Sequence, residues 1–245
     1  FRNYISPFPN LRVLQPNLEF FAKYGCEMMF QQGSGNSLSE FSDLRTYIIA
    51  KLLWNPDADA KEIMNDFIYG YYGDAAPYIS EYIEMLHDFL EASGDNLWIY
   101  GYPFDGFDSN LTPANISVYK DIFDKAEALV MHNPALLDRV QYARLPLDFA
   151  VLDMSLHEAD NTLSWFLNSG DEIKINDEMV ALLDTFTVRC NRLGVKVLNE
   201  QGLSPEAYRL KIKEFLLKIA DRHLGINKSV EIFTEFSPKY DAGGA

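Results

Sequence analysis

The sequence predicts a mainly α-helical protein in which a short α/β piece precedes a long helical region. From residue 38 almost to the end, apolar residues recur every three or four positions, the spacing of amphipathic helices. Serines, prolines and glycines stand where such helices would begin and end. Only two short stretches are typical of strands, which is too few for a complete α/β enzyme. We therefore expect an α/β piece over 1–35, a helical domain over 36–225 and a strand or linker over 226–245.

The first part combines a proline-rich loop, one helix and one apolar run. Pro7 and Pro9 indicate a loop, and the stretch NLEFFAKYG after Pro16 predicts a helix that ends at Gly25. The run CEMMFQ, residues 26–31, is typical of a short buried strand, although its length does not exclude a helix. We expect its cysteine to be a buried free thiol.

The second part reads as a succession of helices. Ser39 is the expected N-cap of the first of them. Trp54, at the end of that helix, is expected in the core, as is Cys190, which lies on the apolar stripe of a later helix. Pro146 should kink one helix or split it in two. The expected helices cover about 39–55, 60–73, 74–94, 114–131, 134–159, 176–193 and 204–224, and KSVEIFTEF, 228–236, is typical of an edge strand.

Composition and motifs exclude several classes of function. The net charge is −15, with 36 acidic and 21 basic residues and no basic stripe, so we expect no nucleic-acid partner. The longest apolar runs, such as Tyr47–Trp54, are far too short to span a membrane. The chain contains no phosphate-binding loop, dinucleotide fingerprint, nucleophile elbow or zinc motif. Its four histidines lie on separate predicted helices or helix ends, so we expect neither a metal nor a cofactor.

The segment after the apolar run is the first candidate for ligand binding. Gln31 and Gln32 would lie at the end of the expected strand, and their amides could donate to and accept from sugar hydroxyl groups. Asn36, Glu40 and Arg45 could line the same cleft. The alternative is structural: Glu40 would compensate the dipole of the first helical turn, and Arg45 would be its neighbour on the helix surface. We favour this alternative for Arg45.

The second candidate is the long loop at 95–115, which is rich in aromatic residues. Trp98 and Tyr100 could stack on the C–H faces of sugar rings, or they could simply fill the core. Long loops inside compact domains often carry function. Two carboxylates in this loop, Asp105 and Asp108, are close enough in sequence to suggest a glycosidase pair, but turn residues that bond to their own backbone have the same pattern.

Three stretches resemble a bacterial family of domains of unknown function: NYISPFPNL (Asn3–Leu11), FQQGSGNSLSEFSDLRTYIIAKLLWNPDAD (Phe30–Asp59) and FIYGYYGDAAPYISEYIEML (Phe67–Leu86). Members of that family occur in secreted polysaccharide-degrading systems, and the family is similar to α-glucuronidase-like glycosidases. The resemblance implies that residues 1–35 form the C-terminal edge of a (β/α)8 barrel and that the helices follow it. The ending TEFSPKYDAGGA resembles the lead-in to a carbohydrate-binding β-sandwich.

The resemblance also implies a role and a place in the cell. Asn10 and Tyr4 would join Gln31, Gln32, Asn36 and Glu40 on the substrate side of a cleft for an oligosaccharide or polysaccharide. The catalytic acids of such glycosidases lie on barrel strands that this chain lacks, so the chain alone would be inactive and none of its residues is identified as catalytic. Its partners would be the missing barrel and downstream modules. Its location would be periplasmic, outer-membrane-associated or secreted.

Two hypotheses follow from these observations. In the first, the chain is a fragment of a carbohydrate-active, glycoside-hydrolase-like protein and contributes a wall of the sugar-binding cleft. In the second, it is a helical scaffold or interaction module that joins the barrel to carbohydrate-binding domains without touching the ligand. An exposed apolar patch on the helices of 176–224 would favour the second hypothesis.

Overall fold

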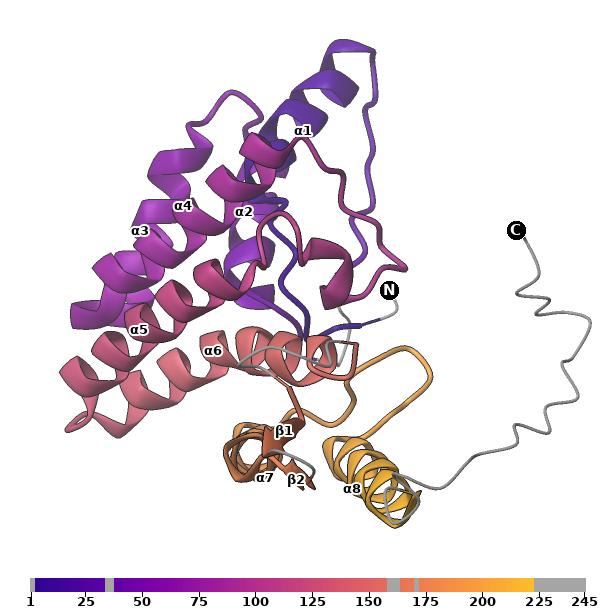
Figure 1. Cartoon of the computed structure of the whole chain (residues 1–245). Coiled ribbons are helices and arrows are strands. Elements are labelled where there is room, and N and C mark those ends of the chain that lie inside the picture. The colour runs from indigo at the N-terminus through magenta and orange to yellow at the C-terminus, as the bar shows by residue number, and fades with distance from the viewer. Residues whose placement is uncertain (1–2, 34–37, 158–163, 170–171, 223–245) are drawn as a thin grey trace, which may run out of the picture.

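The protein is mainly α-helical in a computed structural model that describes residues 3–33, 38–157, 164–169 and 172–222 (Figure 1). Short 3-10 helices, η1 to η3, precede or connect the longer helices. The two strands form one antiparallel hairpin. The elements are η1 Leu11–Val13, α1 Leu14–Lys23, α2 Ser42–Trp54, α3 Ala60–Tyr72, η2 Gly73–Ala75, α4 Ala76–Ser93, η3 Pro103–Gly106, α5 Pro113–Val130, α6 Pro134–Met154, β1 Phe166–Ser169, β2 Glu172–Ile175, α7 Asp177–Leu193 and α8 Pro205–Arg222.

Local sequence signals explain most of the helix boundaries. The side chains of Asp59, Thr112 and Asn133 accept hydrogen bonds from backbone N–H groups in the first turns of α3, α5 and α6. Such caps satisfy donors that have no partner inside the helix. At the other end, Gly94 and Gly194 follow α4 and α7 in the left-handed conformation, which glycine adopts without steric cost. The expected helices of the second part are therefore confirmed, apart from shifts of a few residues at their ends.

The helices from α2 to α8 pack in chain order, each against the next, and α3 also contacts α6 (Figure 1). Their apolar stripes form one core that extends from the N-terminal loop to α8. Burial of this surface is the main favourable term in the stability of the fold. Among the largest side chains with less than 2% exposure are Ile5, Leu44, Ile48, Ile68, Tyr82, Tyr119, Phe123, Trp165 and Phe186.

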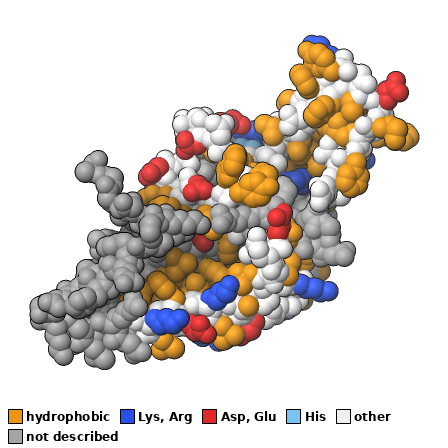
Figure 2. Space-filling view, turned by 90° about the vertical axis from the view of Figure 1, so that its right-hand side faces the viewer, with side chains coloured by type: hydrophobic (Ala, Val, Ile, Leu, Met, Phe, Trp, Pro, Cys, Tyr) orange, Lys and Arg blue, Asp and Glu red, His pale blue; other side chains and the backbone are white. Residues whose placement is uncertain are grey.

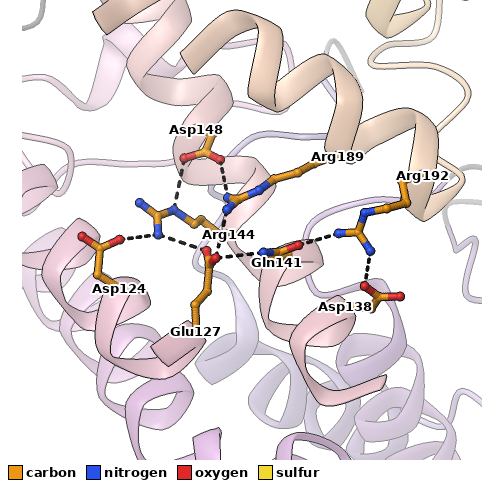
Figure 3. A network of polar contacts seen from close by, with 8 residues as sticks. All are labelled: Asp124, Glu127, Asp138, Gln141, Arg144, Asp148, Arg189 and Arg192. Carbon is orange, nitrogen blue, oxygen red and sulfur yellow. Dashed lines mark hydrogen bonds and ion pairs between the residues drawn. The ribbon is translucent and has the colours of Figure 1, made fainter. Parts of the chain in front are cut away.

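A network of ion pairs ties α5, α6 and α7 together (Figure 3). Asp148 of α6 is only 1% exposed and lies between the guanidinium groups of Arg144 and Arg189, at 3.4 and 3.5 Å. Glu127 of α5 also contacts both arginines, at 3.0 and 2.9 Å. A buried carboxylate needs such partners because removal from water disfavours its charge. The network thus fixes how three helices pack, at a point away from the loops that carry the candidate site.

The sequence analysis was wrong about strands at two places. Residues 26–33 contain no strand, and Met28 and Phe30 are almost fully exposed rather than buried. A strand is stable only when a neighbour pairs with its backbone, and no described segment pairs with this one. Conversely, the hairpin of β1 and β2 was not expected, because each strand has only four residues. The C-terminal edge of a barrel is therefore not seen in the described residues, and the edge strand predicted over 228–236 lies outside them.

Several expectations about single residues also need correction. Trp54 is 92% exposed instead of belonging to the core, since it ends α2 on the side away from the helices that cover its stripe. Cys26 is exposed, whereas Cys190 is a buried free thiol as expected. Pro146 does not split α6, which is one α-helix from Pro134 to Met154.

The helix α1 and the segment that follows it project from the rest of the molecule (Figures 1 and 2). Figure 2 shows hydrophobic side chains gathered on this projection, where Phe20, Tyr24 and Met28 are exposed. On the helices of 176–224, where an exposed apolar patch would favour the scaffold hypothesis, Val188, Leu210 and Leu217 are exposed but stand next to charged residues in the sequence.

Candidate functional site

A cavity of about 770 Å³ lies where the N-terminal loop, the segment after α1 and the loop after α4 meet. It is large enough for several sugar rings, since typical ligand pockets measure about 300–1,000 Å³. The three segments are far apart in the sequence, around residues 3–10, 30–33 and 95–111. The other described lining residues are Ser39 and Glu40 before α2, Arg45 in its first turn, Leu90 of α4 and Glu200. We call this space the loop cavity.

The first wall of the loop cavity is held by both backbone groups of Tyr4. The N–H group of Tyr4 donates to the carbonyl of Leu198 at 2.8 Å, and the carbonyl of Tyr4 accepts from Glu40 N at 3.1 Å. The next residue, Ile5, is fully buried in the core. Pro7 and Pro9 then restrict the backbone that leads to Asn10, the residue before η1.

Glu40 enters the cavity lining through an unusual turn before α2. Phe41 has a φ of 44°, a left-handed conformation that costs a non-glycine residue about 1–3 kcal/mol. Its ring is buried beside Tyr82, with a centroid distance of 6.1 Å, and this packing holds the turn. Consequently α2 begins at Ser42, and the expected N-cap, Ser39, makes no side-chain cap. Its carbonyl instead accepts a hydrogen bond of 2.6 Å from the hydroxyl of Tyr142.

Glu40 and Arg45 form a buried ion pair in this lining. Arg45 Nη2 lies 2.7 Å from Glu40 Oε2, and Glu40 is only 4% exposed. Burial raises the pKa of Glu40 above its ordinary value, while the charge and the hydrogen bond of Arg45 and the backbone of Phe8 oppose the rise. Arg45 also donates to Phe8 O at 3.3 Å and to Asn10 Oδ1 at 3.0 Å. Arg45 is thus paired with Glu40 in a structural role, as the favoured alternative stated, but it joins α2 to the first wall instead of lying on an open helix surface.

The opposite wall is the loop from Asp95 to Leu111. A tight turn, closed by a 2.8 Å bond from Gly101 N to Trp98 O, leaves the Trp98 ring 69% exposed. Glycine is required at position 101, because a Cβ atom there would lie 2.7 Å from Asp105 Oδ2 and 3.0 Å from Trp98 O. The amide of Asn3 reaches across to Gly101 O at 3.4 Å, so the two walls touch each other.

The short helix η3 anchors this loop to α6. The side chain of Asp105 accepts a 2.8 Å hydrogen bond from the backbone N–H group of Tyr102. Asp105 thus closes on its own loop, as the alternative interpretation of this residue stated. The ring of Phe104 packs on Phe107 and on His157, at centroid distances of 5.6 and 4.8 Å. The aromatic residues of the loop accordingly divide between core packing and the cavity.

The structure brings together five of the eight predicted site residues. Tyr4, Asn10, Gln32, Glu40 and Trp98 all line the loop cavity. Gln31 and Tyr100 are not among the lining residues, although each is close to one in the sequence. Gln31 is exposed and donates to the sulfur of Met29. The Tyr100 ring contacts the Trp98 ring edge to face. Asn36 lies outside the described residues.

Sequence reasoning missed several other residues of the lining. Asn3 and Phe8 belong to the same proline-rich loop as Tyr4, and Phe30 precedes the two glutamines. The position of Phe30 directly before the two glutamines indicates a place in the lining. It was missed because residues 26–31 were expected to form a buried strand. Asn96 and Tyr102 lie in the aromatic loop and needed only the assumption that the whole loop, rather than one ring pair, borders the cavity.

The described residues contain neither a cluster of metal ligands nor a helix that could span a membrane. No three histidine, cysteine or acidic side chains gather there in the way a bound ion needs. Within the same residues, none of the helices is both long and apolar enough to cross a bilayer. The loop cavity combines aromatic rings, amides and carboxylates instead, which suits an uncharged, hydroxyl-rich ligand.

Fold and site together define a mainly α-helical protein with a ligand-sized cavity between its loops. Residues 1–84 match a family model described as Domain of unknown function (DUF4838). The matched part contains the first wall, the segment after α1 and the Glu40–Arg45 pair, whereas the aromatic loop lies beyond it. Comparison with curated proteins and with solved structures gives no match.

Proposed function

We propose that the loop cavity binds an oligosaccharide or a segment of polysaccharide, and that the chain is part of a carbohydrate-active, glycoside-hydrolase-like protein. The observation that carries this proposal is the exposed indole of Trp98 on one wall of a cavity whose other walls supply the amides of Asn10 and Gln32. Aromatic faces stack on the C–H faces of sugars, and amides serve both hydroxyl donors and hydroxyl acceptors. A rigid turn at Gly101 holds the ring in place before a ligand arrives.

The carboxylates of the cavity support a binding role rather than a catalytic one. Glycoside hydrolysis needs one carboxyl group that gives up a proton and a second that attacks or activates water. Two of the four carboxylates in the described lining are already engaged within the protein: Glu40 is paired with Arg45, and Asp105 accepts from the backbone of its own loop. We therefore assign no catalytic residue within this chain and propose that it forms a wall of the cleft. A periplasmic, outer-membrane-associated or secreted location, where polysaccharides are met, belongs to the same proposal.

Calorimetric titration with a panel of neutral and uronate oligosaccharides tests the proposal. Trp98→Ala should weaken binding roughly tenfold, because one stacked ring contributes about 1–2 kcal/mol. Trp54→Ala is the control, since Trp54 is also exposed, at 92% against 69% for Trp98, but does not line the loop cavity. Absence of any binding sugar, or equal affinities of the two variants, would remove the sugar-binding proposal.

A helical scaffold or interaction module is the second candidate function. It is favoured by the exposed apolar side chains of the projection, among them Phe20 and Tyr24. Exposed aromatic clusters are typical of surfaces that other protein modules cover. In that case Phe20→Ser should weaken association with the other modules of the same polypeptide, measured by sedimentation velocity, while Trp98→Ala should leave sugar affinity unchanged.

A further inference from the structure

The charges around the loop cavity are strongly unbalanced. Among the described residues of its lining, Asp95 and Asp105 are exposed carboxylates, and Glu40 is paired with Arg45, the one cation there. A fourth acid of the lining, Glu200, takes part in an interaction of its own and does not enter this balance. Neither lysine nor histidine is found among these lining residues. The electrostatic potential in the cavity is therefore negative. The net charge of the whole protein, −15, has the same sign.

The single cation is not available to a ligand. Arg45 donates four hydrogen bonds to groups of the protein: two to Glu40, at 2.6 and 2.7 Å, one to Phe8 O and one to Asn10 Oδ1. A guanidinium has five N–H donors, so to hold the carboxylate of a ligand with two hydrogen bonds Arg45 would have to give up at least one of these four. Glu40, a buried charge, has no other cation among its contacts in the described part of the chain. Breaking a buried pair in this way is strongly unfavourable.

We infer that the loop cavity selects uncharged sugars and discriminates against uronate and sulfated ones. The inference rests on the proposed function and narrows its substrate class. A carboxylate or sulfate on a ligand would meet the negative charges of Asp95 and Asp105 without a free guanidinium to compensate them. In a cavity whose walls exclude part of the water, that repulsion is larger than in bulk solvent.

The same groups suit the hydroxyl groups of a neutral sugar. Carboxylate oxygens accept hydrogen bonds from hydroxyl donors, and bonds to ionised acceptors are stronger than neutral ones. The amide of Asn10 is oriented by its bond to Arg45, which uses Oδ1 and leaves the NH₂ group as a donor toward a hydroxyl oxygen. Gln32 and Asn96 add amides that can donate and accept. Recognition of neutral sugars thus needs no rearrangement of the buried ion pair.

The test compares sugars that differ in charge alone. Oligogalacturonides would be titrated calorimetrically in their free-acid and methyl-esterified forms, and xylo-oligosaccharides with and without glucuronate branches, at low salt. Wherever a sugar binds, its neutral form should have at least about tenfold higher affinity than its acidic form. The difference should shrink as salt rises, because salt screens exposed charges. An acidic member that binds as tightly as its neutral partner, or more tightly, overturns the inference.

Variants separate this result from failure of the proposed function. Asp95→Asn combined with Asp105→Asn removes two charges and keeps an oxygen that can accept from Tyr102 N. It should reduce the preference for the neutral member at least twofold to threefold. The matched control is Asp57→Asn combined with Asp59→Asn, again one exposed residue and one capping residue, neither of which lines the loop cavity. If no member of any pair binds, the sugar-binding proposal fails; if sugars bind in a Trp98-dependent way without charge preference, the charge inference alone fails.

Discussion

Glu40 and Arg45 form the junction between the helical domain and the loop cavity. The carboxylate of Glu40, almost inaccessible to solvent, lies 2.7 Å from Arg45 Nη2, and the same guanidinium holds Phe8 O and Asn10 Oδ1. The pair therefore connects the first turn of α2 to the first cavity wall. It also neutralises the only cation in the described lining, so under the proposed function both fold stability and ligand choice would depend on this contact.

Arg45→Met should lower the free energy of unfolding by about 3–5 kcal/mol, because it leaves Glu40 buried without its cation. Urea denaturation of the variant and of the wild type measures the change. Lys125→Met removes a partner from an exposed pair with Asp121 and should lower the stability far less than Arg45→Met does. The double variant Glu40→Gln, Arg45→Met should be more stable than Arg45→Met alone. If it is equally destabilised, the loss is due to the packing of Arg45 and not to the uncompensated charge.

Two arginines of α7 should differ sharply in their effect on stability (Figure 3). Arg189→Met removes one of two cations from the buried Asp148 and one from Glu127, and should cost about 2 kcal/mol or more. Arg192→Met breaks a pair with Asp138 that is nearly half exposed on both sides, and should change the stability by less than about 0.5 kcal/mol. Denaturant unfolding of both variants gives the comparison. Equal losses would show that the network of Figure 3 does not depend on burial.

Asp153 should make the protein less stable as the pH rises. Burial raises its pKa from 3.8 to about 6, with His157 opposing the rise and Asp105 adding to it, and its Oδ2 has no hydrogen-bond partner in the part of the chain that the structure describes. Between about pH 4 and pH 6 the folded state binds the proton that the unfolded state has lost, so the contribution of this group to stability falls through that window.

The measurement is the difference in unfolding free energy between Asp153→Asn and the wild type across pH 4 to 8. Because the amide cannot ionise, the variant should gain about 2–3 kcal/mol relative to the wild type between pH 4 and pH 7.5. Asp88→Asn, an exposed acid on α4, controls for the general effect of removing a negative charge. A difference that does not change with pH would show that Asp153 has an ordinary pKa.

The two neighbouring glutamines should behave differently toward sugars. Gln32→Ala should weaken oligosaccharide binding about threefold to tenfold, the effect of about one lost hydrogen bond, because this residue lines the loop cavity. Gln31→Ala should have no effect, since its side chain donates to Met29 and does not border the cavity. Calorimetry with the tightest neutral oligosaccharide measures both. The opposite ranking would place the ligand on the outer side of this segment.

Helical periodicity predicted the mainly α-helical class and the presence of the helices, with ends that differ by a few residues, because spacing and caps are local properties of the sequence. It could not predict that residues 26–33 are exposed, since an apolar run becomes a strand only when another segment pairs with it. Trp54 was expected in the core because its helix has an apolar stripe. In the structure the stripe is buried only as far as Leu52, and the sequence does not show where the neighbouring segments stop covering it.

Individual residues of the candidate site could be predicted from the sequence, but their arrangement around one cavity could not. Gln32 and Trp98 were identified from loop chemistry and Tyr4 from the family resemblance, yet only the structure shows that they line one cavity. The role of Arg45 could not be read from the sequence, because its partners Phe8 and Asn10 lie 37 and 35 residues away. Arg45 follows the left-handed turn at Phe41 by one helical turn, and nothing in the sequence predicts this conformation for a phenylalanine.

Hydrogen–deuterium exchange with and without a saturating neutral oligosaccharide tests most directly whether the loop cavity is the binding site. Amides around 3–10 and 95–106 are far apart in the sequence but line opposite walls. We predict that both segments gain protection together, and that α1, α7 and α8 do not change. Protection on the projection or on α7 and α8, without protection of the two walls, would contradict the account.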